Sequence, residues 1–243
     1  MIDKNLTYHI TLTSIDSLII QWDFETIDAQ SVRILQAFKK YLKELDQNDI
    51  LYLTPAFDTL LVKFKSNAFD INSKKKVYQK VCKSFLSKDI ELDNFKSFEI
   101  PVCYENFGID LEYISKQTDL KVEDIINIHS DTIYTLHFIG FLPGFLYLGH
   151  VDKRIQMPRH QQPRTKVERG SVGIAENQTG IYPMSSPGGW QIVGRTPLDI
   201  FDAKKDKPSP FQPGDQIKFT PISLSKFESI QQSKNPLKYL KTL

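Results

Sequence analysis

The 243-residue sequence has little cysteine, little net charge and no long apolar run. Two cysteines, Cys82 and Cys103, are too few for a disulfide framework, so we expect both to be buried free thiols. A net charge of +2 argues against nucleic acid or a membrane surface as a partner. No stretch approaches the roughly 18 apolar residues of a membrane span, and the first residues lack the pattern of a secretory signal. We expect a soluble, cytoplasmic protein.

Standard catalytic and metal-binding motifs are also missing. The sequence contains no P-loop, no Gly-x-Ser-x-Gly, no His-Glu-x-x-His and no Cys-x-x-Cys. Its five histidines are widely scattered, and neutral histidines readily serve structural hydrogen bonds. We therefore expect no metal site, and any nucleotide has to bind without a P-loop of this chain.

Glycine and proline are nearly absent from the first hundred residues. All 11 glycines lie at or after Gly108, and of 13 prolines only Pro55 precedes Pro101. Such a change in turn-forming residues indicates two architectures, joined within the segment 88–97. We predict an N-terminal α/β domain over residues 1–94 and a second domain over residues 95–243.

The first domain is predicted to have the order ββαββα. Its two helices are indicated by apolar residues at helical spacing, with Asp28 as the N-cap of the first helix and with Val77, Val81 and Phe85 on the inner face of the second. A small sheet with both helices on one face fits this order. The predicted segments are strands 8–14, 17–23, 49–54 and 59–65, and helices 28–45 and 73–88.

The second domain begins with a predicted strand over 96–104 and two short helices over 108–117 and 121–130. From residue 133 onward, short β-rich runs alternate with Gly and Pro turns. Runs of this length are typical of a closed or sandwiched sheet.

Arginine, glycine and aromatic residues concentrate in the second domain. Loops that are distant in sequence can converge on one face of such a sheet, and would there provide apolar walls and a cationic fork for a small ligand that carries a carboxylate. The alternative is that the arginines are ordinary surface residues and the glycines only form turns. The residues concerned are Arg159, Arg164, Arg169 and Arg195, together with Phe141, Phe145, Tyr147, Tyr182 and Trp190.

Three motifs of this region, in this order, resemble those of the family formed by the B subunits of 5-oxoprolinases. They are Pro-Gly-Phe at 143–145, Gln-Thr-Gly-Ile-Tyr-Pro at 178–183 and Pro-Gly-Gly-Trp at 187–190. The family is also called the allophanate hydrolase subunit 1 family and includes KipI-type inhibitors of a histidine kinase. The match is strong over about residues 101–202, whereas the N-terminal half is similar in layout more than in motif.

The resemblance implies an α+β protein in which a cyclophilin-like β-barrel domain follows the small N-terminal domain. It also implies the B subunit of an ATP-dependent 5-oxoprolinase, which acts with the A and C subunits to convert 5-oxoproline to glutamate through a phosphorylated lactam. ATP would then be a co-substrate, bound at an inter-subunit site or on a partner. The alternative is a KipI-type protein inhibitor, with a sensor histidine kinase as its partner.

Under the enzyme interpretation, we expect Arg195 and Arg164 to contact anions and His129 to carry a proton. A histidine at the end of a predicted helix can instead simply favour the negative end of the helix dipole. Gln178 and Thr179 would bind the lactam amide. The remaining predicted substrate-binding residues are Phe145, Arg159, Tyr182, Gly188, Gly189 and Trp190.

The chain departs from the family pattern at two glycine positions. Glu176 stands where the family often has the last glycine of Gly-Ile-Ala-Gly, and His150 stands where a second glycine commonly follows Gly149. Glu176 is expected to add negative charge near the proposed anion site.

Overall fold

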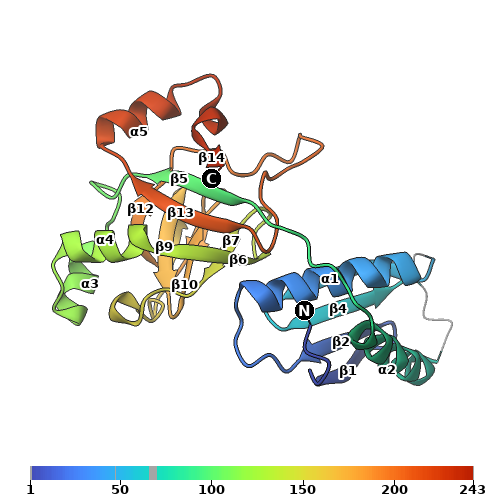
Figure 1. The fold of residues 1–243 in the computed structure, drawn as a ribbon. Helices are drawn as coiled ribbons and strands as arrows, with labels where there is room; N and C mark the ends of the chain where they lie inside the picture. Colours follow the sequence, from blue (N-terminus) through green and yellow to red (C-terminus); the bar gives the residue numbers. More distant parts are fainter. Residues whose placement is uncertain (1, 47, 66–69, 243) are drawn as a thin grey trace. The chain divides into compact units, whose positions relative to one another are not determined.

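The computed structural model in Figure 1 describes residues 2–46, 48–65 and 70–242. The chain forms two compact units: the first ends at Asn94 and the second begins at Phe95. Each unit has a hydrophobic core of its own, so each is described separately.

The first unit repeats the order strand, strand, helix twice. Its antiparallel sheet has the strand order β1-β2-β4-β3. Alternate residues of the central strands β2 and β4 are buried, and they pack with side chains of both helices in one core. The elements are β1 (Tyr8–Ser14), β2 (Ser17–Trp22), α1 (Ala29–Leu45), β3 (Ile50–Ala56), β4 (Thr59–Phe64) and α2 (Ile71–Ser87).

Aromatic rings from three elements fix the two helices on this sheet. Trp22 of β2 is fully buried and meets Phe38 of α1 edge to face at 5.0 Å between ring centroids. Phe85 of α2 lies 4.8 Å from Phe38 and 6.0 Å from Trp22. Such rings bury large apolar areas, so this trio forms the centre of the first core.

The second unit contains the remaining elements. Its helices are α3 (Leu111–Thr118), α4 (Val122–Asp131) and α5 (Leu224–Gln231), with 3-10 turns η1 (Lys153–Ile155) and η2 (Pro236–Tyr239). Its strands are β5 (Ser97–Val102), β6 (Ile133–Ile139), β7 (Leu146–Gly149), β8 (Arg164–Val167), β9 (Ser171–Ala175), β10 (Gln178–Ile181), β11 (Ser186–Gly188), β12 (Gln191–Arg195), β13 (Gln216–Pro221) and β14 (Lys241–Thr242).

The main sheet of the second unit is open rather than a closed barrel. Its eight strands have the order β12-β9-β10-β7-β6-β13-β5-β14, and only β5 and β13 pair in parallel. One isolated bridge joins the chain just after β5 to the end of β12: Cys103 and Arg195 exchange two backbone hydrogen bonds of 2.9 Å. The expected barrel is therefore replaced by an open sheet, because a single residue pair, and not a strand ladder, connects these two strands in the described chain.

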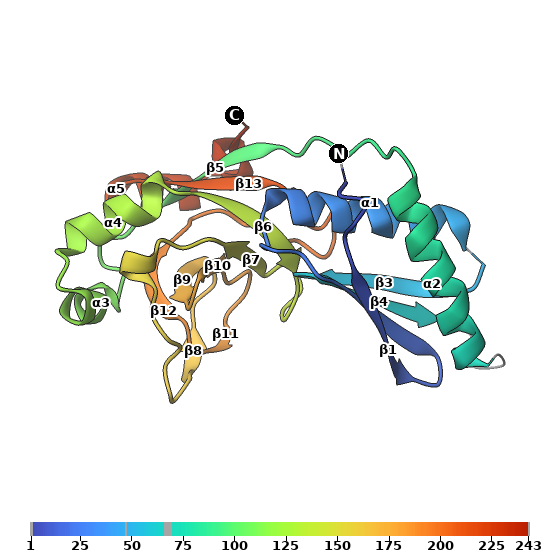
Figure 2. The ribbon, with the colours of Figure 1, turned by 60° about the horizontal axis from the view of Figure 1, so that its bottom comes forward.

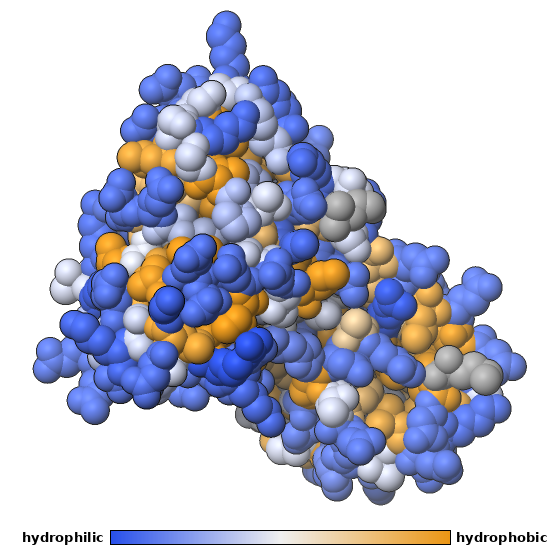
Figure 3. Space-filling view, turned by 60° about the vertical axis from the view of Figure 1, so that its left-hand side comes forward, coloured by the Kyte–Doolittle hydropathy of each residue, from blue (hydrophilic) through white to orange (hydrophobic). Residues whose placement is uncertain are grey.

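Strands β8 and β11 form a separate two-stranded sheet beside the main one (Figure 2). Both cysteines are free and buried, as the sequence predicts. Among the described residues, no helix is long and apolar enough to cross a membrane. On the face shown in Figure 3, hydrophobic residues lie in patches between hydrophilic ones, which is ordinary for a protein surface.

Candidate functional site

A pocket in the second unit brings together two of the predicted anion-binding residues. Arg164, at the start of β8, and Arg195, at the end of β12, both line it. Lys166 and Glu168 add further charge to its wall. We call this hollow the arginine pocket.

The walls between these charges are apolar. Phe107 and Ile109 come from the loop before α3, while Val167 and Ile192 come from β8 and β12. The pocket has an empty volume of about 460 Å³. Apolar walls with a few charged groups are the usual composition of a site for a small organic anion.

Arg164 is held by a buried carboxylate. Its Nη2 donates to Oδ1 of Asp110 at 2.5 Å, and its Nη1 donates to the carbonyl oxygen of Trp190 at 3.4 Å. The Asp110 side chain is only 6% exposed, and its other oxygen, Oδ2, accepts the backbone N–H of Ile192 at 2.6 Å. A charge-assisted pair shielded from water in this way fixes the guanidinium in place.

Sequence reasoning missed Asp110. An aspartate just before an amphipathic helix indicates an N-cap, yet at α3 no side-chain cap bond forms. The carboxylate turns instead toward residues 54 and 82 positions later, Arg164 and Ile192. His160 also approaches it, with Nε2 3.5 Å from Asp110 Oδ1.

Arg195 has different surroundings. Its Nε donates to the carbonyl oxygen of Arg169 at 2.7 Å, and its guanidinium carbon lies 5.6 Å from the ring centre of Phe107. Burial lowers the pKa of Arg195, Glu168 opposes that effect and Arg169 adds to it. An arginine stays protonated in spite of such a shift. Within the described residues, no carboxylate forms an ion pair with Arg195.

The predicted aromatic residues form a small core behind the arginine pocket. Phe145 meets Tyr182 at 5.0 Å and Trp190 at 5.2 Å, both edge to face, and all three are at most 5% exposed. Val167 and Ile192 belong both to this cluster and to the pocket wall. The aromatic residues therefore support the pocket from behind and do not line it.

The two glycines of Pro-Gly-Gly-Trp differ in their surroundings. A Cβ on Gly188 would lie 2.4 Å from the Tyr182 hydroxyl, so glycine lets β11 approach this ring closely. A Cβ on Gly189 would meet nothing nearer than 3.5 Å. The close backbone approach expected at Gly188 is thus to a tyrosine of the same chain.

Gln178 and Thr179 lie toward the opposite end of strand β9 from Arg195. In strand β9, Ser171 pairs with Arg195 on one side, while Ala175 pairs with Gln178 on the other. Four residues of strand separate these positions by about 13 Å. The structure therefore does not bring Gln178 into the arginine pocket.

His129 lies in the core, with both ring nitrogens hydrogen-bonded. Thr179 Oγ1 donates to the carbonyl oxygen of Gly173 at 3.0 Å, so His129 Nε2 donates to Thr179 Oγ1 at 2.9 Å. This tautomer leaves Nδ1 to accept from the Tyr104 hydroxyl at 2.8 Å. Burial lowers the pKa of His129 to about 3. A neutral, fully bonded histidine at this place is structural, and it does not meet Arg164 or Arg195 at the pocket.

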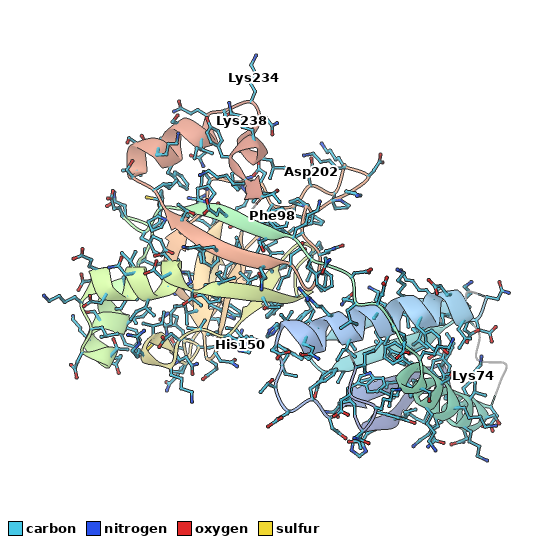
Figure 4. All side chains as sticks on the ribbon, in the orientation of Figure 1. Lys74, Phe98, His150, Asp202, Lys234 and Lys238 are labelled. Atoms are coloured by element: carbon cyan, nitrogen blue, oxygen red, sulfur yellow. The ribbon has the colours of Figure 1, made fainter. Side chains whose placement is uncertain are left out.

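Three further predicted positions lie on loops. Arg159 is exposed. His150, labelled in Figure 4, and Glu176 are exposed and have φ values of +73° and +53°. Glu176 lies beside Gln178, at the end of β9 away from Arg195, so its charge does not reach the pocket as the sequence had suggested. In the described parts of the chain, no group of three or more His, Cys, Asp or Glu residues is placed to hold a metal ion.

Comparison with known proteins gives consistent matches. A family model described as carboxyltransferase domain, subdomain C and D, matches residues 8–211. A protein of Bacillus subtilis strain 168, named as the B subunit of 5-oxoprolinase, is 36% identical over 224 residues, which are 87% of this chain and 92% of that protein. A Haemophilus influenzae protein of the same name is 45% identical over 134 residues, covering 54% of this chain and 63% of that protein.

A solved structure supports the fold. The urea amidolyase of Kluyveromyces lactis superposes with a TM-score of 0.77 and 19% identity. The match covers all of this chain and 17% of the amidolyase. At this identity the likeness concerns the fold alone.

Proposed function

The chain belongs to the carboxyltransferase subdomain C and D family and is a relative of the 5-oxoprolinase B subunits, and on this premise we propose that it is the B subunit of an ATP-dependent 5-oxoprolinase. The complex would convert 5-oxoproline to glutamate. A lactam is a poor electrophile, and phosphorylation of its carbonyl oxygen creates a good leaving group for ring opening.

The observation that supports this proposal is the arginine pocket, whose charge and apolar walls suit the substrate. 5-Oxoproline is a small ring with one carboxylate. The pocket combines apolar walls, which include Phe107 and Ile192, with the guanidinium of Arg195, which has no carboxylate partner among the described residues. Arginine recognises carboxylates through two parallel hydrogen bonds. In this proposal the pocket binds the substrate, and the phosphorylation and ring opening are completed with the A and C subunits.

We place ATP outside the arginine pocket, at an inter-subunit site or on a partner. The sequence has no P-loop, and the paired charges of Arg164 and Lys166 leave little positive charge for a triphosphate. A cytoplasmic location fits the two free thiols Cys82 and Cys103, because disulfides are rare there.

The inhibitor interpretation receives less support. The Bacillus subtilis and Haemophilus influenzae relatives carry the name of an enzyme subunit, and the pocket suits a small molecule. A prolyl isomerase activity would rest on fold likeness alone, which does not transfer function.

Reconstitution tests the proposal. The purified chain alone should leave 5-oxoproline intact, and its mixture with the A and C subunits and ATP should release glutamate. We expect Arg195→Ala to lower kcat/KM by about 10²-fold, the usual effect of removing one charged donor from an active site. Arg154→Ala, on an exposed arginine paired with Asp152, is the matched control and should keep full activity. Full activity of Arg195→Ala, or no activity of the complete mixture, would contradict the proposal.

A further inference from the structure

The two guanidinium groups of the arginine pocket are not equivalent, and we propose that the pocket selects ligands with a single negative charge. In this arrangement the ligand carboxylate binds Arg195, and Asp110 acts as a positioning residue that neutralises Arg164. The identification of the ligand as the carboxylate of 5-oxoproline rests on the proposed function, whereas the charge selectivity rests on the geometry of this chain.

Arg164 already forms an ion pair with Asp110. Its Nη2 lies 2.5 Å from Asp110 Oδ1, and the carboxylate is nearly inaccessible to water at 6% exposure. Pulling the pair apart would leave a buried charge without a partner, which is strongly unfavourable. Arg164 therefore contributes hydrogen-bond donors to the pocket but little net charge.

The second cation of the pocket wall is neutralised as well. Lys166 Nζ lies 2.7 Å from Glu168 Oε1, and both side chains are at least half exposed. Three cationic side chains and two carboxylates thus leave one positive charge in excess. Because no carboxylate of the described residues pairs with Arg195, that excess charge is on Arg195.

Arg195 is also held in an orientation suited to a carboxylate. The bond from its Nε to Arg169 and the ring of Phe107 beneath it restrict the guanidinium plane. The two terminal nitrogens have no partner among the contacts of the described residues, and two parallel N–H groups match the two oxygens of a carboxylate. A ring attached to that carboxylate would rest against Ile109, Val167 and Ile192.

Charge selectivity has a consequence for the reaction. A phosphate dianion brings one negative charge more than the pocket can neutralise. The phosphoryl group that activates the lactam must then meet cations outside the arginine pocket, on a partner subunit. The charges of the pocket therefore favour binding of a carboxylate by Arg195 over neutralisation of a phosphoryl group.

The first experiment compares ligands by calorimetry on the full chain. We expect 5-oxoproline to bind at least ~10-fold more tightly than 2-pyrrolidinone, which lacks the carboxylate, and inorganic phosphate to compete poorly. Arg195→Gln should abolish the preference for 5-oxoproline, and Arg154→Gln should keep it. Equal affinity for the two lactams, displacement by phosphate at the concentration of 5-oxoproline, or no binding of 5-oxoproline would overturn the inference.

The second experiment changes the charge of the pocket. Asp110→Asn retains the size of the side chain and Glu168→Gln lies on the surface, and each removes one negative charge. Both variants should gain phosphate affinity by ~10-fold while still binding 5-oxoproline. If Asp110→Asn fails to fold, Glu168→Gln, at an exposed position, still tests whether loss of a negative charge raises the affinity for phosphate. Unchanged phosphate affinity in the folded variants would contradict the inference.

These outcomes are separable from those of the proposed function. If the reconstituted mixture is active but phosphate binds the pocket as well as 5-oxoproline does, the charge selectivity is wrong and the enzyme function stands. If the pocket discriminates as expected but the mixture is inactive, the selectivity stands and the enzyme function fails.

Discussion

Among single residues, the two departures from the family's glycines lie where glycine is most useful. His150 and Glu176 both have positive φ, a conformation in which a side chain costs about 1–2 kcal/mol. Glu176 is the first residue of the two-residue turn between β9 and β10, a position that favours glycine. The resemblance revealed these positions from the sequence, although it suggested an electrostatic rather than a conformational effect for Glu176.

We therefore expect Glu176→Gly to raise the free energy of unfolding by roughly 0.5–1 kcal/mol, since relief of the strained φ exceeds the extra chain entropy of glycine. The backbone bond from Glu176 to Met157 needs no side chain and should persist. Urea denaturation checks the value. Asn177→Gly, in the same turn but without positive φ, is the control and should give no gain.

The site residues show how far sequence alone reaches. Arg164 and Arg195 were predicted and do share a pocket, although Arg164 belongs to the β8–β11 pair and Arg195 to the β9–β12 pair. Gln178 was expected to join them as a lactam-binding residue, and strand register then separates it from Arg195. Asp110 was missed because its partner, Arg164, lies 54 positions away, and no local sequence pattern predicts a pair at that separation.

At the scale of elements, helices were more predictable than the faces they bury. Helix α1 begins after Asp28, as predicted. In α2, Val81 and Phe85 are buried as predicted, but Val77 is 50% exposed. Tyr78 is buried beside them, with its hydroxyl 3.1 Å from Asp46. A tyrosine with a polar partner can replace an aliphatic residue in the core, and periodicity does not reveal that partner. No helix was predicted at α5.

The N-cap of α1 provides a test at this scale. Asp28 Oδ1 accepts the backbone N–H of Ser31 at 2.9 Å, and Ser31 Oγ accepts the N–H of Asp28 at 2.8 Å. Asp28→Ala should cost the first unit about 1 kcal/mol of unfolding free energy, while Asp28→Asn, which can still cap, should cost much less. Trp22 fluorescence during urea denaturation reports this unit. Equal losses in the two variants would show that the cap bond is not the cause.

For the whole molecule, the change in glycine and proline content near residue 100 coincides with a boundary between two cores. The sheet of the second unit was harder to predict. Short strands between turns indicate a curved or packed sheet, but whether its edges pair depends on a few long-range bonds. Here the isolated bridge between Cys103 and Arg195 is the contact concerned, and no sequence pattern predicts it.

The buried His129 makes the stability of the second unit depend on pH. Its pKa is about 3 in the folded chain and near 6.5 when exposed, so the unfolded state takes up more protons between these values. The contribution of the neutral His129 to the free energy of unfolding is present above pH 6.5 and is lost progressively as the pH falls toward 3. From pH 7.5 to pH 5 the loss should be on the order of 2 kcal/mol.

Trp190 fluorescence in a Trp22→Phe background follows this unit alone. His129→Gln should be less stable at pH 7.5 and should lack most of the loss on acidification. His9→Gln, at an exposed position of the first unit, is the control and should leave the pH dependence of the Trp190 signal unchanged. A wild-type chain as stable at pH 5 as at pH 7.5 would contradict the assignment.

Arg195 serves the molecule twice, through atoms that do not depend on each other. Its peptide group forms two hydrogen bonds with the backbone of Cys103, while its side chain lines the arginine pocket. A substitution of the side chain leaves the peptide N–H and carbonyl in place, so the bridge to Cys103 persists while the chemistry of the pocket changes. Substitutions at this position can therefore change which ligand binds without disturbing the backbone of the sheet.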